Sequence, residues 1–415
     1  MLETLLREEW GRLLALLVAQ FRRLDLAEDG LADAFEAASR RWPVDGEPEN
    51  GPAWLLTTAR RRIVDRMRSE EVLARKMPLL AVDAALTQDA QRVMASVPLE
   101  GDGVTDERLR LVLLCAHPTL SREAAAALTL RLVLGVSTED IGRLFLQSKA
   151  TMAARLTRAR KRLAGASFEV PSDVTDLADR IGIVAEVAYL AFTAGYAPGT
   201  GPDVVRTDLA GEAIRLVRVL RAVLPEPDPE VDALLALMLL QHSRRAARIG
   251  PDDGLVLLPD QDRARWKLDE ITEALAILTP LAHGAPARYL LQALIAAEHA
   301  VAPSSEATSW GRIVERYDEL LALHDTPVVH LNRAVAVAEA RGPEAGLEAL
   351  ESVALPGHRL PAVRAQLLER AGRRVDAVEA FDEAIALCAH GPERAELARR
   401  RAAAAYVRKD LNINR

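Results

Sequence analysis

The sequence predicts an all-α protein, and three observations support this fold class. Leu, Ala, Arg and Glu, which favour helix, dominate the 415 residues. Runs in which apolar and polar residues alternate, as in a half-buried strand, are scarce. Apolar residues instead recur at helical spacing between breaks rich in Pro and Gly. The chain is too long for one compact core, so we expect two or three domains.

Charge is distributed unevenly along a chain whose net charge is −7. Residues 1–166 hold 25 basic and 23 acidic side chains, so the excess of acid lies in residues 167–415. This balance argues against non-specific coating of nucleic acid and still allows a local basic site. Cys115 and Cys388 lie far apart in apolar contexts, which predicts two buried thiols and no disulfide framework. No signal peptide or membrane-length apolar run is present, so we expect a cytoplasmic protein.

The first 166 residues predict two small helical modules joined by a linker. The first module, residues 1–75, contains helices at 2–24, 26–41 and 52–71, with a break starting at Trp42–Pro43. Residues 76–108 are mixed in character and are predicted to be a linker. The second module, residues 109–166, contains two helices divided at His117–Pro118, followed by a helix-turn-helix.

The helix-turn-helix is the strongest pattern in the chain. Val136–Leu146 forms its first helix, with Ser137 as the expected cap and Asp140 as its capping-box partner. A tight break at Gln147–Ser148 precedes the second helix, Lys149–Leu163, which Ser148 caps. Ile141, Leu144 and Phe145 should pack inward, and so should Met152, Leu156 and Leu163.

The outward face of this second helix is basic. The 27 residues 141–167 carry seven basic side chains and no acidic one. The first turns of such a helix enter the major groove, where Arg reads guanine, Thr contacts a thymine methyl and Lys holds phosphate. The candidate DNA-binding residues here are Lys149, Thr151, Arg155 and Arg158. The alternative is a solvated amphipathic helix with no ligand.

A second basic run, Arg60–Arg68, follows Trp54 in the first module. An aromatic ring near a helix start, with arginines along the helix, suits single-stranded or melted DNA through stacking and phosphate contacts. The alternative is a core tryptophan with arginines at a solvated C-terminal turn. The candidate DNA-binding residues of this run are Trp54, Arg61, Arg62 and Arg66.

After a second linker at residues 167–175, residues 176–415 predict one helix after another. Breaks recur at roughly 25–50 residues, which suggests stacked helical hairpins. Ala365–Gly372, followed by Ala377, Phe381 and Ala384, resembles the small/large pattern of a tetratricopeptide unit. Another α-solenoid, or a single irregular bundle, is also compatible with the pattern.

Three segments of the two modules resemble sigma-70-type transcription factors. Leu26–Ala38 is similar to the helix that docks on the polymerase clamp, and Pro52–Arg68 to the helix that engages the −10 element. Residues 109–163 resemble region 4, which reads the −35 element. Two such modules joined by a short linker resemble an extracytoplasmic-function (ECF) sigma factor. Leu257–Trp266 and Leu331–Ala338 resemble the subgroup with a tetratricopeptide-like C-terminal extension.

The resemblance implies core RNA polymerase and promoter DNA as partners, with no membrane, cofactor or metal. It implies that polymerase binds Asp29, Asp33 and Glu36, and that the loop from Pro43 to Asn50 holds a flipped −10 base, which makes Asn50 a DNA-binding candidate. It also implies an extension that is needed for activity and that replaces a membrane-bound anti-sigma partner. The sequence leaves open whether this acidic extension masks the basic helices, touches polymerase or receives a regulatory protein. The chain departs from the pattern at Gly30, where a larger apolar residue is usual and where Gly weakens helix formation.

Other functions remain as alternatives. A one-component helix-turn-helix regulator with a helical sensor domain would bind duplex DNA without polymerase. An all-α enzyme would use Asp260 and Asp262 as paired carboxylates. Such residues more often cap a helix and pair with arginine, and Arg244–Arg248 offers the expected partner for such an ion network. A repeat scaffold would have no role on DNA. The eight histidines are scattered, and no metal-ligand spacing, phosphate loop or nucleophile elbow is present.

Overall fold

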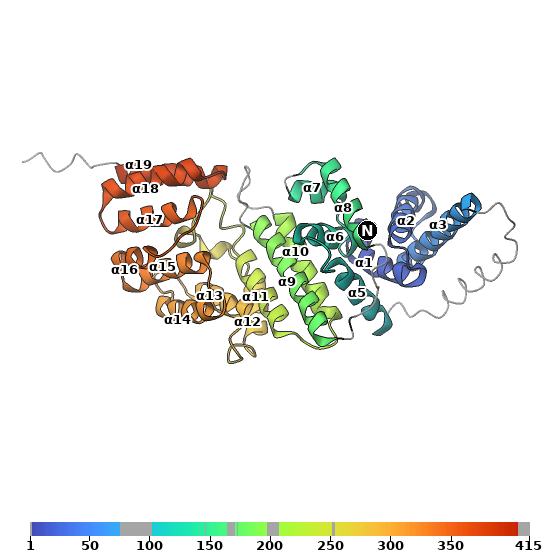
Figure 1. The fold of residues 1–415 in the computed structure, drawn as a ribbon, viewed down its shortest axis with the longest axis horizontal. Coiled ribbons are helices and arrows are strands. Elements are labelled where there is room, and N and C mark those ends of the chain that lie inside the picture. Colours follow the sequence, from blue (N-terminus) through green and yellow to red (C-terminus); the bar gives the residue numbers. More distant parts are fainter. Residues whose placement is uncertain are drawn as a thin grey trace, which may run out of the picture. The chain divides into compact units, whose positions relative to one another are not determined.

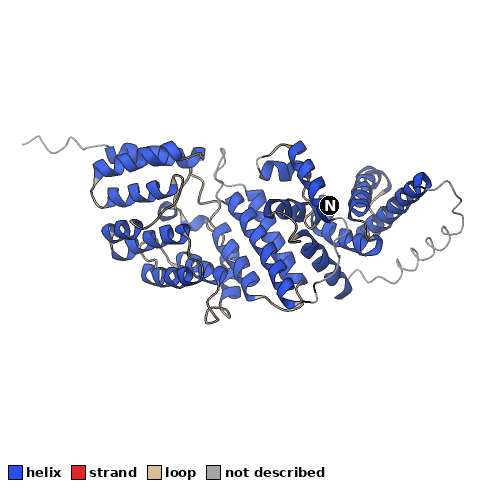
Figure 2. Ribbon diagram, viewed as in Figure 1, coloured by secondary structure: helices blue, strands red, loops and turns tan. Residues whose placement is uncertain are grey.

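The computed structural model describes residues 2–74, 102–145, 147–163, 171, 173–196, 207–250 and 254–405. Within these ranges every regular element is a helix, apart from an isolated β-bridge between Ile249 and Leu255 (Figures 1 and 2). The predicted all-α class is therefore confirmed. No helix among the described residues is long and apolar enough to cross a membrane.

The chain divides into two compact units. The first comprises Met1–Ala188 with Arg215–Glu226, and the second comprises Tyr189–Ile214 with Pro227–Arg415. Helices α9 (Val174–Tyr196) and α10 (Thr207–Val223) contribute residues to both units. The sequence predicts that the helical extension begins at residue 176, close to the start of α9.

The first unit begins with three helices that share one core. Leu13 and Leu17 of the first helix, Leu31 of the second and Ile63 of the third are completely buried. Burying an aliphatic side chain of this size contributes about 1.5–3 kcal/mol, so these contacts hold the three helices together. The helices of the first unit that precede α9 are α1 (Leu2–Phe21), α2 (Leu24–Asp45), α3 (Gly51–Ala74), α5 (Asp102–Cys115), α6 (Arg122–Leu132), α7 (Thr138–Leu144) and α8 (Lys149–Leu163).

Helix α2 continues past the break that the sequence predicted at Trp42–Pro43. It runs to Asp45 and ends at Gly46, which has a φ of 86° and donates its backbone N–H to the Trp42 carbonyl. Pro43 removes one backbone hydrogen bond and its ring crowds the carbonyl four residues earlier, yet the helix continues for two residues beyond it. The glycine, which adopts a positive φ at little cost, is the residue that ends this helix.

Gly30 lies where α2 and α3 approach each other most closely. A Cβ built at this position would lie 2.6 Å from Cγ1 of Ile63 and 3.1 Å from the carbonyl oxygen of Ala59. Ile63 is completely buried, so it has little room to move away. Gly30, at which the chain departs from the sigma-factor pattern, thus allows two helices to approach closely. This role comes in addition to the loss of helix propensity that the sequence predicted.

Replacing Gly30 with a larger apolar residue, as is usual in the sigma-factor pattern, should destabilise the first unit. We expect Gly30→Leu to lower the free energy of unfolding by about 1–3 kcal/mol, because the extra methyl groups overpack a filled core. Gly182→Leu is the matched control, since Gly182 lies in helix α9 with no atom within 4 Å of an added Cβ. Urea denaturation followed by circular dichroism measures both, and equal stability of the two variants would contradict the prediction.

Helix α5 starts inside the segment predicted to be a linker. The sequence predicts a linker to residue 108 because Gly101–Gly103 looks like a break, whereas the helix begins at Asp102. An acidic residue at a helix start interacts favourably with the helix dipole, which offsets the glycine at 103. The predicted division at His117–Pro118 is present, and α6 begins after Ser121, whose hydroxyl accepts the backbone N–H of Ala124 at 3.3 Å.

The second unit consists mainly of helices that pack against one another as successive hairpins (Figure 1). Two short 3-10 helices, η1 (Leu258–Asp260) and η2 (Arg263–Arg265), interrupt the succession. The remaining helices of this unit are α11 (Pro229–His242), α12 (Leu268–Leu278), α13 (Arg288–Val301), α14 (Trp310–Leu323), α15 (Pro327–Arg341), α16 (Pro343–Leu350), α17 (Arg359–Arg370), α18 (Arg374–Leu387) and α19 (Gly391–Ala405).

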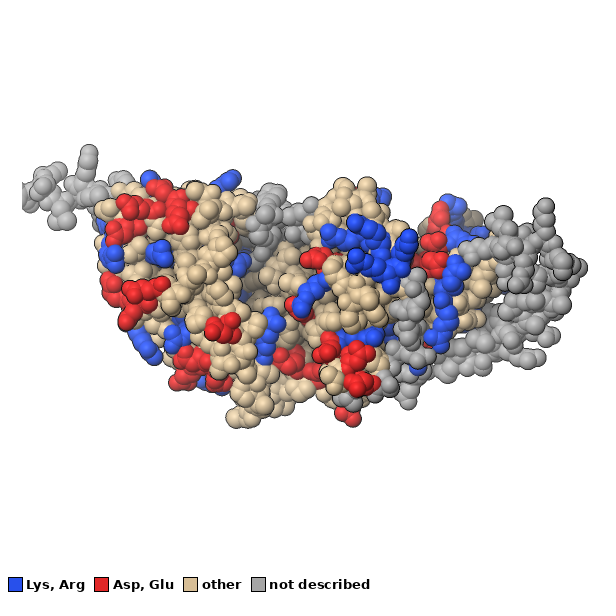
Figure 3. Space-filling model, viewed as in Figure 1, with Lys and Arg blue, Asp and Glu red and all other residues tan. Residues whose placement is uncertain are grey.

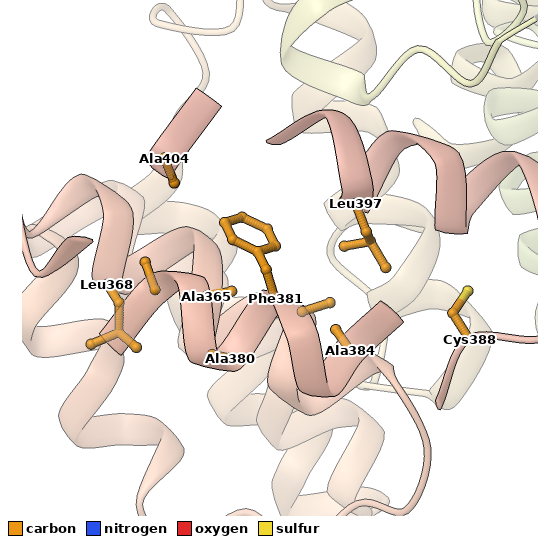
Figure 4. Packing of buried hydrophobic residues seen from close by; sticks show 10 residues of the cluster. Ala365, Leu368, Ala380, Phe381, Ala384, Cys388, Leu397 and Ala404 are labelled. Atoms are coloured by element: carbon orange, nitrogen blue, oxygen red, sulfur yellow. The ribbon is translucent and has the colours of Figure 1, made fainter. Parts of the chain in front are cut away.

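The segment with the repeat-like pattern forms the hairpin of α17 and α18. Ala365, Ala377, Phe381 and Ala384 are all completely buried. Figure 4 shows the Phe381 ring among small side chains, with Leu397 of α19 close by. The alanines let the helices approach, and the aromatic ring fills the space between them. The small/large pattern thus predicted the core of this hairpin, and its likeness to a tetratricopeptide unit remains a prediction.

Candidate nucleic-acid interface

The helix-turn-helix is formed by α7 and α8, and local hydrogen bonds set both of its helix starts. The backbone N–H of Asp140 donates to the Ser137 hydroxyl at 3.1 Å, and that hydroxyl donates to the Asp140 carboxylate at 2.5 Å. The backbone N–H of Thr151 donates to the Ser148 hydroxyl at 3.1 Å. Each cap satisfies an N–H that the helix itself leaves unpaired. Both predicted caps are confirmed.

The turn between α7 and α8 depends on a close backbone approach. The N–H of Gln147 donates to the carbonyl oxygen of Gly142 at 2.8 Å. A Cβ on Gly142 would lie only 2.9 Å from the carbonyl oxygen of Gln147. A side chain at this position would therefore force the turn to open, which is why glycine suits the helix that precedes it.

One face of α8 is buried and the opposite face carries the basic residues. Met152, Leu156 and Leu163 are buried as the sequence predicted, and so is Ile141 of α7, while Phe145 is half-buried. The side chain of Leu144 lies outside the described residues. On the other side, Lys and Arg side chains gather over the part of the first unit that contains α8 (Figure 3).

The predicted DNA-binding residues of α8 are accessible. Lys149, Thr151 and Arg158 are exposed, and Arg155 is half-buried. The ammonium of Lys149 pairs with the exposed Glu139 at 3.2 Å, a contact worth about 0–1 kcal/mol that phosphate can replace. Arg158 donates only to the carbonyl of Ala154 in its own helix. Among the described residues, no carboxylate forms an ion pair with Arg158 or with the following exposed pair, Lys161 and Arg162.

Arg160 differs from its neighbours because it is held inside the first unit. Its guanidinium donates to one carboxylate oxygen of Glu28 at 2.5 Å, and Nε of Arg131 donates to the other at 2.6 Å. Glu28 is only 5% exposed, so it is a buried acid between two arginines. These three residues, here called the Glu28 triad, connect α2, α6 and α8. This triad was not predicted from the sequence, although Glu28 stands four residues after Leu24 and three before Leu31, on the apolar stripe of α2.

The predicted DNA-binding residues at the start of α3 have local structural roles. The carboxamide oxygen of Asn50 accepts the backbone N–H of Ala53 at 3.0 Å, so this exposed residue caps the helix. The half-buried Trp54 ring packs edge-on against Trp42, with 5.5 Å between the ring centroids. An indole in this position is held rigid and keeps part of its surface accessible for stacking.

The arginines farther along α3 lie in three environments. Arg61 and Arg62 are exposed, as expected for residues that contact phosphate. Arg60 is 6% exposed, and burial lowers the pKa of its guanidinium. Arg66 lies across from α2, where it pairs with Asp33 at 2.9 Å and Asp29 at 3.2 Å.

The Arg66 pairs bring predicted DNA-binding and polymerase-binding residues together. Asp29 and Asp33, expected on the polymerase side, hold the arginine that was expected on the DNA side. Glu36, the third predicted polymerase-binding residue, pairs with Arg40 one turn later on α2. All three carboxylates stay at least one-third accessible, with Asp33 the least exposed at 34%. They remain available to a partner with a positively charged surface.

The carboxylates proposed for an enzyme have structural roles in the second unit. Asp262 accepts the backbone N–H of Ala264 at 3.0 Å and caps η2, and Asp260 lies 3.6 Å from Arg400. The sequence predicted that Arg244–Arg248 pairs with Asp260 and Asp262, and this prediction is wrong. Arg245 instead pairs with Glu270 of α12 at 2.9 Å. Glu270 therefore takes the place of Asp260 and Asp262 as the acidic partner. Asp260 is exposed to solvent, and Asp262 caps a helix.

The described part of the chain contains one group of side chains with mixed metal-ligand character. Ligand atoms of His358, Cys388 and Glu393 lie within 4.8 Å of one another. His358 and Glu393 also form an ion pair at 3.1 Å, and the Cys388 thiol donates to the carbonyl of His390 at 3.5 Å. These contacts connect the residue before α17, the residue after α18 and the first turn of α19.

His299 of α13 lies in a positively charged part of the second unit. Its carbonyl accepts a hydrogen bond from Arg263 at 2.6 Å, and its ring packs edge-on against Trp310 at 5.1 Å. Burial, followed by the charges of Arg244 and Arg263, lowers the pKa of His299 from 6.5 to about 4. The imidazole is therefore neutral at neutral pH.

This shift predicts a loss of stability in mild acid. The unfolded chain takes up the His299 proton near pH 6.5, whereas the folded chain resists protonation down to about pH 4. The resulting contribution is present above pH 6.5 and declines as the pH falls, by up to about 3 kcal/mol. Urea midpoints between pH 7 and pH 4 measure it. His299→Gln should flatten the profile, and an unchanged slope in this variant contradicts the prediction.

The fold and the basic helix define a class: an all-α, helix-turn-helix DNA-binding protein. Residues 110–163 match the family described as sigma-70, region 4. Residues 180–282 match a family of unknown function, DUF6596. An uncharacterized protein of Rhizobium meliloti (strain 1021) is 40% identical over 405 residues, which cover 95% of this chain and 92% of that protein. No solved structure matches the chain.

The chain belongs to one family with the Rhizobium meliloti protein, and its residues 110–163 match sigma-70 region 4. A DNA-binding role like that of a sigma factor follows from this match. The matched residues include α7 and α8 in full, with all four candidate DNA-binding residues of α8.

Proposed function

We propose that the chain is an ECF-type sigma factor that directs promoter-specific transcription initiation. Residues 109–166 read the −35 element through the outward face of α8. Residues 1–75 bind core RNA polymerase through Asp29, Asp33 and Glu36, and hold melted −10 DNA through Asn50, Trp54, Arg61, Arg62 and Arg66. Residues 176–415 form an extension that regulates these steps. Neither module binds strongly alone, and polymerase joins them into one unit of high effective concentration.

One observation carries this proposal: within the region 4 match, α8 presents the exposed side chains of Arg158, Lys161 and Arg162, with which no described carboxylate forms an ion pair. A second supports it, because exposed arginines on α3 stand beside an indole that is held in place. The all-α enzyme receives no comparable support, since Asp260 and Asp262 have structural partners.

The test is reconstituted transcription with the purified full-length chain and bacterial core polymerase on fragmented genomic DNA. We expect a stable complex with core enzyme and discrete run-off products that core enzyme alone does not make. Trp54→Ala should reduce open-complex formation and preserve binding to duplex −35 DNA. Specific binding to duplex DNA with no complex with core enzyme would favour the one-component regulator instead. Absence of both activities would leave a scaffold with no role on DNA.

A further inference from the structure

The second unit contains a cavity of about 520 Å³ that the proposed DNA and polymerase contacts do not use. Its wall comes from α9, α11, α13, α14 and α15, together with the segments that follow α11 and contain η1. Leu258 and Asn332 belong to two segments that the sequence analysis singled out, Leu257–Trp266 and Leu331–Ala338, and both line this cavity. Segments distant in the sequence therefore converge on one hollow of the size that small organic ligands occupy.

The charged groups of the cavity wall are all basic. Arg244 and Arg288 line it, and no Asp or Glu does. Elsewhere in this acidic part of the chain, arginines commonly pair with carboxylates, as Arg245 does with Glu270. Among the described residues, neither Arg244 nor Arg288 has a carboxylate partner. The two guanidiniums thus leave an uncompensated positive charge beside the cavity.

Both arginines are held in place by aromatic rings. The guanidinium of Arg244 lies 5.8 Å from the centroid of the Trp266 ring, and that of Arg288 lies 5.3 Å from the centroid of the Tyr289 ring. Nε of Arg288 is buried and has no hydrogen-bond acceptor among the described residues. A buried donor without an acceptor is costly, and an anion in the cavity would supply one.

The rest of the wall is mostly uncharged and partly apolar. Leu237, Ile295 and Leu320 contribute aliphatic surface, and Tyr317 contributes a ring. Gln292 is already occupied, because its carboxamide oxygen accepts the hydroxyl of Tyr189 at 3.0 Å. His299, also on the wall, is neutral at neutral pH and adds no charge of its own. A ligand that matches this wall has an anionic group and an apolar body.

We propose that this cavity binds a small organic anion with an apolar body, whose anionic group is held by Arg244 and Arg288. This assignment goes beyond the proposed sigma-factor function and does not depend on it. Through this cavity the second unit would respond to a small molecule, in addition to any protein partner.

Two dyes that share one skeleton separate the roles of charge and apolar surface. 1-Anilinonaphthalene-8-sulfonate carries a sulfonate, and N-phenyl-1-naphthylamine is the same molecule without it. Titrated into the full-length chain, the anionic dye should bind at one saturable site, with an affinity about 10-fold or more above that of the neutral dye, because charge-assisted hydrogen bonds hold the sulfonate. Octanoate should displace the anionic dye, whereas acetate, which has no apolar body, should not.

Variants then assign the binding to the cavity. Arg288→Gln and Arg244→Gln should each weaken the anionic dye by about 10-fold and leave the neutral dye nearly unchanged. Arg370→Gln is the matched control, since Arg370 pairs with Glu339 outside the wall. Ala296→Trp fills the cavity and should remove both dyes. Melting curves by circular dichroism confirm that each variant is folded.

Three results would overturn the assignment. They are equal affinity for the two dyes, anionic-dye binding that survives both arginine substitutions, and anionic-dye binding that survives in folded Ala296→Trp. The last result would place the dye elsewhere on the surface. Because all readouts are binding to the free chain, they remain informative even if the chain fails to bind polymerase.

Discussion

Reversing two charges on α8, with Arg155→Glu and Arg158→Glu together, should lower affinity for promoter DNA by about 100-fold or more. Each arginine that contacts a base edge or phosphate contributes roughly 1–3 kcal/mol, and a glutamate in its place repels the backbone. Among the described residues, Arg158 forms no ion pair and donates to a carbonyl of its own helix, so its replacement should leave the fold intact. Binding of the complex with core polymerase to a selected promoter fragment, measured at fixed salt, gives the number.

The control for this prediction separates local contact from net charge. Arg359→Glu with Arg364→Glu on α17 changes the net charge by the same amount, and neither residue has a carboxylate partner among the described residues. We expect at most a small loss of DNA affinity in this control. Equal losses in the two double variants would show that α8 has no special role.

Glu28→Ala should destabilise the first unit by about 3 kcal/mol, because removing one partner leaves two arginines facing a site that is closed to water. The carboxylate of Glu28 is 6% exposed, and the side chains of Arg131 and Arg160 are 20% and 25% exposed. Water reaches the arginines in part, so the loss should fall at the lower end of the range for a buried pair. Urea denaturation at neutral pH measures it.

Glu36→Ala provides the comparison on the same helix. Its carboxylate is 59% exposed and pairs with Arg40 one turn away, so its loss should cost about 0–1 kcal/mol. A similar cost for the two glutamates would mean that the Glu28 triad contributes no more than a surface ion pair.

Local signals made the helix-turn-helix predictable. Its second helix spans Lys149–Leu163, as the sequence predicted, because a serine cap starts it and an apolar stripe runs along its length. The all-α class followed in the same way from composition and spacing. The break at Trp42–Pro43 was wrong, because the helix continues through the proline and ends three residues later, at a glycine with a positive φ.

The partners of the charged residues could not be predicted. Whether Arg66 faces solvent or Asp33 depends on how α2 and α3 pack against each other. The angle between two helices cannot be predicted from a local sequence pattern. Glu28 shows a signal that the sequence did contain: an acid on an apolar stripe calls for a buried cation. The cavity was harder still to predict, because Arg244, Arg288 and Asn332 line it only after several helices have packed together.

The position of Arg66 between two aspartates has a thermodynamic consequence. The two carboxylates offset the charge of Arg66, so a cationic partner that takes Asp29 and Asp33 strengthens the attraction of Arg66 for an anion. Linkage makes this reciprocal: an anion on Arg66 raises the affinity of the two aspartates for that partner by the same factor. Cooperativity between two ligands can thus arise from the exchange of one ion pair, with no change in the fold.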